Sequence, residues 1–132
     1  MKQFSILQLR HALEASWKAD TAYLGVFEEG NPALGNCYPT SRVVQHYFPD
    51  TEIVEGEVKT PNGVEKHFWN VLTVNENEYH IDLTWQQFPV GSYIETYRTR
   101  DRHRLNDGQD AIRRVELLLN RVEVFLREHK PN

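Results

Sequence analysis

Three residues along this chain have the types needed for a nucleophilic thiol site: Cys37, His67 and Asp82. A cysteine thiol is only a few per cent ionised at neutral pH, and the thiolate is the nucleophile. A histidine within hydrogen-bond reach can take the thiol proton and later give it to a leaving group. A carboxylate on the other ring nitrogen fixes the tautomer of that histidine. The sequence therefore offers a nucleophile, an acid–base group and an orienting acid.

The single cysteine of the chain, Cys37, opens a run that predicts a helix over residues 37–48. Pro39 fits the first turn of such a helix, where a missing N–H leaves no hydrogen bond unmade. The unpaired N–H groups and the positive end of the helix dipole favour a thiolate at this place. Val44 and Phe48 share a helical face with Cys37, so we expect the thiol to point toward whatever packs on that face.

The histidine and the aspartate are predicted on a hairpin of two apolar stretches, residues 66–74 and 78–85. With Asn75 and Glu76 at the tip, Asp82 lies opposite Trp69 and diagonal to His67, roughly 7–8 Å apart between backbones. That distance suits a hydrogen bond between His67 and Asp82. A slip by one residue would turn Asp82 to the wrong face of the hairpin.

Several alternatives remain open at this point. His80 shares a predicted face with Asp82 and can replace His67 as the partner of the thiol. A lone cysteine is often a small buried hydrophobe, so Cys37 can instead be a structural or redox thiol in a non-enzymatic interaction module. Cys37, His67 and Asp82 can also ligate zinc, although they lack the close ligand spacing typical of zinc sites. Solvent access to Cys37 separates an enzyme from a module with a core thiol.

Other polar and aromatic residues are candidates for supporting such a site. Asn36 or Asn31 can donate to an oxyanion beside the N–H of Cys37, and the sequence does not separate the two. Asn70 is predicted on the face of its strand opposite to His67 and Asp82, so it can help only through another geometry. The aromatic candidates for the walls of a substrate cleft are Trp69, Tyr38 and Trp85.

Composition limits the classes to which the protein can belong. A length of 132 residues predicts one domain spanning residues 1–132, and 39% apolar and 26% charged residues are typical of globular proteins. A net charge of −4 argues against a general nucleic-acid binder. Neither a membrane span nor a signal peptide is expected, and a single cysteine fits a reducing cytosol. We expect a cytoplasmic protein without a metal, cofactor, nucleic-acid or membrane partner.

The remaining segments predict helices around this hairpin. An amphipathic helix over residues 5–19 begins with a capping box of Ser5 and Gln8. Residues 52–60 predict a strand, and residues 96–104 predict an exposed loop. The arginines within Arg98–Arg104 would lie in that loop, where they can bind an anionic substrate or partner. A last helix to about residue 128 is predicted from a side-chain cap, either Asn106 with Gln109 or Asp107 with Asp110.

An ordered set of short motifs resembles the YunG-like family of small bacterial proteins over nearly the whole chain. The motifs are Ser16-Trp17 with Thr21, Gly35-Asn36-Cys37 with Thr40, Val43, Val44 and Gln45, His67-Phe68-Trp69-Asn70, and Asp82-Leu83-Thr84 with Gln87-Phe88. The family is essentially uncharacterised, so the resemblance implies an architecture and a candidate triad rather than a substrate. The order of cysteine, histidine and aspartate is similar to that of papain-like and transglutaminase-like thiol enzymes.

We therefore expect an α+β fold in which helices pack on a small antiparallel sheet of three to five strands, in a papain-like or transglutaminase-like arrangement. The expected activity is hydrolysis or transfer of an acyl or amide group from a peptide or small molecule. Cys37 would attack the carbonyl, His67 would act as acid and base, and Asp82 would orient His67.

Overall fold

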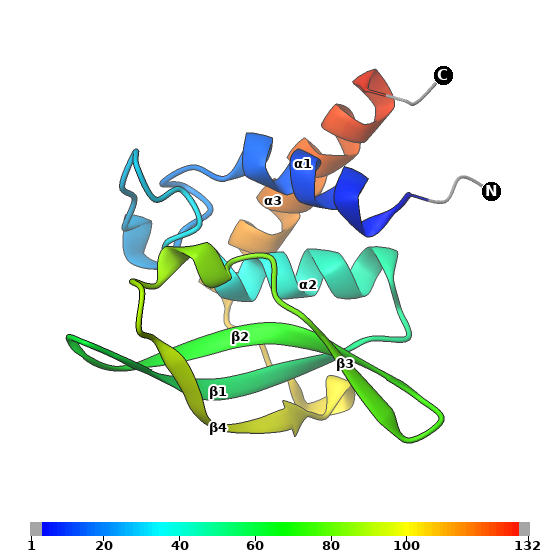
Figure 1. Ribbon diagram of the computed structural model, residues 1–132. Coiled ribbons are helices and arrows are strands. Elements are labelled where there is room, and N and C mark those ends of the chain that lie inside the picture. The colour runs from blue at the N-terminus through cyan, green and yellow to red at the C-terminus, as the bar shows by residue number, and fades with distance from the viewer. Residues whose placement is uncertain (1–3, 130–132) are drawn as a thin grey trace.

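The computed structural model describes residues 4–129, in which three α-helices pack on a four-stranded antiparallel sheet (Figure 1). The helices are α1 (Ile6–Ser16), α2 (Cys37–Tyr47) and α3 (Gln109–Glu128). The strands are β1 (Glu52–Thr60), β2 (Gly63–Val74), β3 (Asn77–Ile81) and β4 (Tyr93–Arg100), in the spatial order β3-β2-β1-β4. Three short 3-10 turns connect them, η1 (Tyr23–Gly25), η2 (Trp85–Gln87) and η3 (Arg102–Arg104). The predicted α+β class and antiparallel sheet are confirmed.

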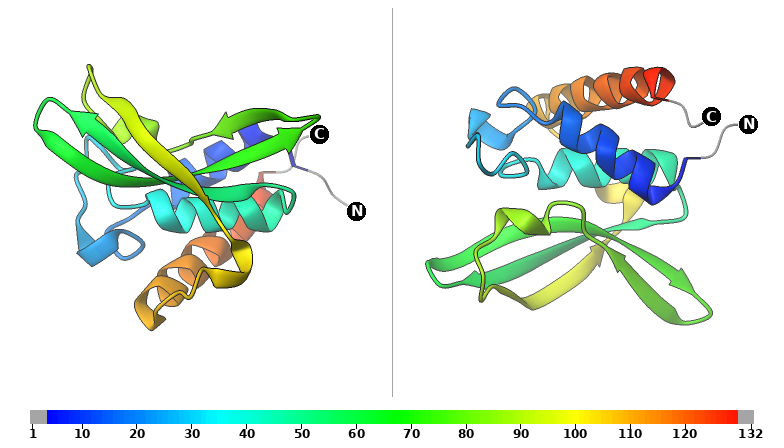
Figure 2. Two further views of the ribbon diagram at one scale, coloured as in Figure 1. Left: turned by 90° about the horizontal axis from the view of Figure 1, so that it is seen from below. Right: turned by 45° about the horizontal axis from the view of Figure 1, so that its top comes forward.

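The helices form a layer on one side of the sheet, and α2 lies next to β2 (Figures 1 and 2). Both α1 and α2 pack against α3, so the apolar stripes of the three helices meet between them. The fully buried side chains of this core include Leu9, Leu13, Val43, Leu118 and Val122. No helix within residues 4–129 combines the length and the apolar content needed to cross a membrane.

Helix α1 begins with the predicted capping box, which is confirmed. The Ser5 N–H donates to Gln8 Oε1 at 2.7 Å, and the Gln8 N–H donates to Ser5 Oγ at 3.1 Å. The helix ends at Ser16, earlier than predicted, because Trp17 adopts an extended backbone. The indole N–H of Trp17 donates to Thr40 Oγ1 at 2.9 Å, which ties the end of α1 to the first turns of α2.

The hairpin of β2 and β3 has the predicted register. Asn75 and Glu76 both have positive φ angles, 50° and 70°, as a two-residue turn that matches strand twist requires. Asn70 pairs with Ile81, so the next position of the hairpin sets Asp82 opposite Trp69. The predicted extension of β3 to residue 85 is wrong, and the strand ends at Ile81.

An aspartate turn explains why β3 is short. The N–H of Thr84 donates to Asp82 Oδ1 at 3.2 Å, and such a local bond offers the backbone an alternative to the strand ladder. The chain then turns through η2 instead of continuing beside β2. Asp82 is thereby fixed at the end of the strand, where its second carboxylate oxygen is free to reach β2.

The sheet is curled, and its two faces have different partners. Along β2, His67 and Trp69 point to one face, while Phe68 and Asn70 point to the other, toward α2. Tyr97 on one edge strand donates its hydroxyl hydrogen to Glu78 Oε1 on the opposite edge strand at 3.3 Å. The face that carries His67 and Trp69 is therefore concave.

The prediction of a loop over residues 96–104 is wrong, because β4 occupies Tyr93–Arg100 and pairs with β1, and η3 follows at Arg102–Arg104. Nearly all of β4 is exposed, so its side chains show no alternation of apolar and polar residues. Its hydrogen bonds go to β1, a partner distant in sequence. The signal that remains is its content of Tyr, Ile and Thr, residues that favour strands.

The predicted side-chain cap of α3 is also wrong. The helix starts at Gln109 after Gly108, which has no side chain to cap it. The carboxylate of Asp107 is instead bound by the hydroxyl of Tyr38 and lies 3.2 Å from Arg42 Nε. The start of α3 is thus held against α2 by side chains from both elements.

Candidate functional site

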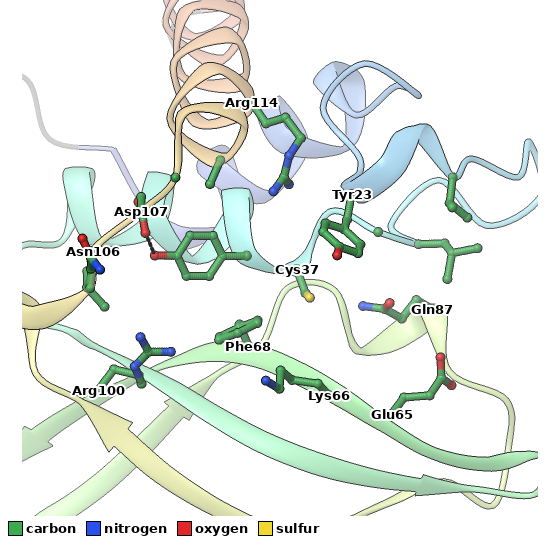
Figure 3. A pocket seen from close by; sticks show the side chains of 17 residues that line it. Tyr23, Cys37, Glu65, Lys66, Phe68, Gln87, Arg100, Asn106, Asp107 and Arg114 are labelled. Carbon is green, nitrogen blue, oxygen red and sulfur yellow. Dashed lines mark hydrogen bonds between the residues drawn. The ribbon is translucent and has the colours of Figure 1, made fainter.

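A cleft of about 590 Å³ opens at the N-terminus of α2, with Cys37 on its wall (Figure 3). The other walls come from the η1 loop, the first half of β2, η2, the end of β4 and the start of α3. Cys37 is half-buried, and its sulfur points into the space between Phe68 and Gln87. Its thiol is therefore reached from the cleft, which we call the Cys37 cleft.

The loop before α2 is shaped by two residues that place Cys37. Gly35 has a φ of 79°, and a Cβ there would lie 3.0 Å from the Ala22 side chain, so the close turn requires glycine. Asn36 is fully buried; its Oδ1 accepts from Thr21 Oγ1 at 2.7 Å, and its Nδ2 donates to the Pro32 carbonyl at 3.2 Å. The Asn36 amide thus supports the loop from within.

The structure brings His67 and Asp82 together. His67 Nε2 lies 2.7 Å from Asp82 Oδ2, a short hydrogen bond between a fully buried ring and a mostly buried carboxylate. The other carboxylate oxygen of Asp82 is held by Thr84, so the acid cannot rotate away. This contact follows from the register of the β2–β3 hairpin.

The second ring nitrogen of His67 has a different environment. Its Nδ1 is buried and has no hydrogen-bond partner of ordinary geometry among the described residues. Burial lowers the pKa of His67, but the hydrogen bond to Asp82 and the interaction with Cys37 outweigh burial and raise that pKa to about 9. Because Asp82 binds Nε2 of His67, His67 interacts with Cys37 through Nδ1. At neutral pH the ring is an imidazolium.

Aromatic rings enclose His67. Trp69 stacks on it with a centroid distance of 5.4 Å, and Phe88 and Trp85 approach it edge-on at 4.8 and 6.1 Å. Trp69 is buried, so it is a core side chain rather than a wall of the Cys37 cleft. Trp85 likewise packs against the imidazole. The two tryptophans shield the ring from water on the concave face.

His80, the alternative partner, has another role. Its Nδ1 accepts a hydrogen bond from the indole N–H of Trp69 at 2.8 Å, and its Nε2 lies 3.6 Å from Glu78. Asp82 is bonded to His67 and not to His80. His80 therefore fixes the orientation of Trp69, which in turn stacks on His67.

The two remaining asparagine candidates both hold elements together. Asn70 donates to the Ser41 carbonyl at 3.0 Å, which fastens α2 to β2. Asn31 donates to the Gln87 carbonyl at 2.9 Å, which fastens the loop before α2 to η2. The side chain of Gln87, absent from the sequence-based candidates, lies on the Cys37 cleft beside Cys37 (Figure 3). Its place in the Gln87-Phe88 motif and in the turn after Asp82 is the sequence signal that could have suggested it.

Tyr38 lines the Cys37 cleft, and its ring packs on Phe68 with a centroid distance of 4.8 Å. Its hydroxyl donates to the carboxylate of Asp107. Burial and this carboxylate both raise the pKa of Tyr38 well above its ordinary value, so the phenol stays protonated. Tyr38 therefore offers the cleft a neutral aromatic face.

A comparison with protein families matches residues 5–127 to the YunG protein family. The chain belongs to the YunG family. The match includes Cys37, the β2–β3 hairpin and nearly all of α3. Searches of curated proteins and of solved structures found no match.

In this YunG-family chain the arginines predicted in a loop are mostly bound to acids. Arg98 and Arg100 contact Glu55 at 3.3 and 2.6 Å, and Arg102 pairs with Glu52. Of these, Arg100 reaches the Cys37 cleft. Among the described residues, no group of three or more His, Cys, Asp or Glu side chains is arranged to hold a metal ion.

Proposed function

We propose that this YunG-family protein is a thiol enzyme that hydrolyses or transfers acyl or amide groups. The observation that carries the proposal is the environment of His67. One ring nitrogen is held by a carboxylate at 2.7 Å, and the other is buried next to Cys37 without an ordinary hydrogen-bond partner within residues 4–129. Cys37 in turn lies on an open cleft, as a nucleophile must and a structural thiol need not.

In the resting pair, the Cys37 proton already resides on His67 Nδ1, so the reaction starts from a thiolate and an imidazolium. A raised pKa of His67 favours this charged form, and the Nε2 bond to Asp82 stabilises it. The thiolate attacks the substrate carbonyl carbon, and the C–S bond forms as the carbonyl electrons move to oxygen. His67 Nδ1 then protonates the leaving amine or alcohol, and the bond to the leaving group breaks.

In the second step, water or an amine replaces the leaving group in the cleft. His67 Nδ1 accepts a proton from this acceptor, which attacks the carbonyl carbon of the thioester. Collapse of the second tetrahedral intermediate breaks the C–S bond and returns the thiolate. The balance of hydrolysis and transfer then depends on which acceptor the Cys37 cleft admits.

Two donors can stabilise the oxyanion of both intermediates. The N–H of Cys37 lies in the first turn of α2, where it has no intrahelical acceptor and where the helix dipole is positive. The Gln87 amide lies beside the sulfur in Figure 3, and its Nε2 already donates one hydrogen to the Thr84 carbonyl at 3.0 Å. The other hydrogen is left for a substrate oxygen.

We also infer that α2, β2 and β3 form a small papain-like or transglutaminase-like core. In such an arrangement the nucleophile starts a helix, and the histidine and acid follow on neighbouring strands. The chain order of Cys37, His67 and Asp82 and the hairpin register support this inference.

Acylation of the protein tests the proposal directly. The purified chain is incubated with 4-nitrophenyl acetate and related activated acyl donors, and intact mass reports the acyl-enzyme. We expect wild type to acylate at Cys37, Cys37→Ala not to acylate, and His67→Ala to acylate roughly 10²-fold or more slowly at pH 7, as loss of an acid–base group predicts. His11→Ala, which removes an exposed histidine of α1, is the matched control and keeps the wild-type rate. Equal rates for wild type and His67→Ala would contradict the proposal.

A further inference from the structure

A buried arginine faces the Cys37 cleft from α3. Arg114 is 5% exposed, and its Nη1 is buried without a hydrogen-bond partner among the described residues. Its Nε donates to Asp110 at 2.9 Å, and its guanidinium lies 5.6 Å from the centroid of the Tyr23 ring. Figure 3 shows the guanidinium pointing into the cleft, on the side of Tyr23 and Cys37. The proposed acyl chemistry does not use this group.

We propose that Arg114 binds a carboxylate of the substrate, so that the enzyme acts on amides or esters that carry a carboxylate near the scissile acyl group. The claim about which substrates react rests on the proposed function, whereas the claim that Arg114 binds a carboxylate does not. A buried N–H without an acceptor is costly, and a ligand that supplies the acceptor removes that cost. A carboxylate does so best, because a hydrogen bond between two charged groups is stronger than a neutral one.

The rest of the cleft agrees with this ligand. Lys66 and Arg100 line the opposite wall and add positive charge, partly offset by Glu55 and by Glu65 on the rim. The other acid on the cleft, Asp107, is bound by Tyr38 and lies beside Arg42, so it repels an anion less.

The apolar parts of the wall limit the size of the anion. Phe68, Leu34 and Leu105 also line the cleft, and they suit a short hydrocarbon chain between a carboxylate and an acyl carbon. The Nη1 group carries two N–H donors, and the apolar walls around it suit a carboxylate on a short hydrocarbon chain better than a strongly hydrated phosphate. We therefore assign a carboxylate rather than a phosphate.

Binding is tested without any reaction, by NMR titration of the folded protein. Succinate, glutarate and adipate are each compared with the corresponding neutral diamide, and the shifts of α2 and α3 amides give Kd values. We expect at least one dicarboxylate to bind about tenfold or more tightly than its diamide, as loss of a charge-assisted hydrogen bond predicts. Arg114→Gln should remove this preference.

Arg113→Gln is the matched control, because Arg113 also pairs with Asp110 at 2.9 Å but lies outside the cleft lining. It should keep the preference, and Arg114→Lys should keep part of it. If Arg114→Gln does not fold, the assignment is still tested by comparing dicarboxylate with diamide binding in wild type and in Arg114→Lys. Equal binding of dicarboxylates and diamides, or an unchanged preference in Arg114→Gln, would overturn the assignment. The binding comparison involves no acylation of Cys37, so failure of the acyl chemistry and failure of carboxylate binding are distinguishable.

Discussion

The raised pKa of His67 makes the stability of the fold depend on pH in a defined direction. Its pKa is about 9 in the folded protein and 6.5 in an unperturbed histidine. A pKa that is higher in the folded state gives stability that is present in full below pH 6.5. This stability is lost as the pH rises through about 9. The difference corresponds to about 3 kcal/mol, a large part of the roughly 5–15 kcal/mol that stabilises a domain.

Asp82→Asn isolates this effect because it removes the negative charge from the partner of His67 Nε2. Urea unfolding at intervals from pH 6 to pH 9.5 gives the free energy of unfolding, with Asp82→Asn and its parent both in a Cys37→Ala background that removes the opposite pH dependence of the thiolate. We expect the parent to lose up to about 3 kcal/mol over this interval and Asp82→Asn to lose less than half as much. Asp50→Asn, which changes an exposed carboxylate, should follow the parent. Parallel curves for the parent and Asp82→Asn would refute the pairing as the cause of the raised pKa.

Two further predictions concern packing. Leu118→Ala on α3 should cost about 2–5 kcal/mol in urea unfolding, because Leu118 is fully buried. Ile112→Ala, at a position 44% exposed on the same helix, should cost much less, and equal losses would show that α3 is not part of the core. Gly56→Ala should cost about 1–3 kcal/mol, because the new Cβ would lie 2.4 Å from the Trp69 ring. Gly30→Ala, with nothing within 4 Å, should be nearly neutral, and a neutral Gly56→Ala would contradict the packing of Trp69.

Local patterns predicted those parts of the fold that depend on neighbours in sequence. Ser5 and Gln8 are three residues apart, so their capping box is visible without tertiary structure. The even number of residues in the turn at Asn75 and Glu76 sets the parity of the hairpin, and with it the face of Asp82. Strand β4 was not predicted, because its hydrogen bonds go to a strand that is distant in sequence and its side chains are exposed.

In the candidate site, too, contacts between residues close in sequence were predictable and contacts between distant residues were not. The contact of His67 with Asp82 lies within one hairpin, so parity alone could place it. The Cys37 cleft, however, combines residues from the η1 loop to the start of α3. Arg114 could not be singled out from the sequence, because the buried Nη1 without a partner among the described residues exists only after folding. Asp107 is one of two alternative caps that the sequence predicts for the last helix, and the sequence does not reveal its actual partner, because Tyr38 is distant along the chain.

The rate at which iodoacetamide alkylates Cys37, measured against pH in the folded protein, tests the central claim most directly. An imidazolium beside the sulfur and the start of α2 both favour the thiolate, so we expect wild type to react well at neutral pH. His67→Ala should lower the rate at neutral pH, Asp82→Asn should lower it less, and His11→Ala, which removes an exposed histidine of α1, should change little. A Cys37 that reacts only when the protein unfolds, or a profile that His67→Ala leaves unchanged, would contradict the account.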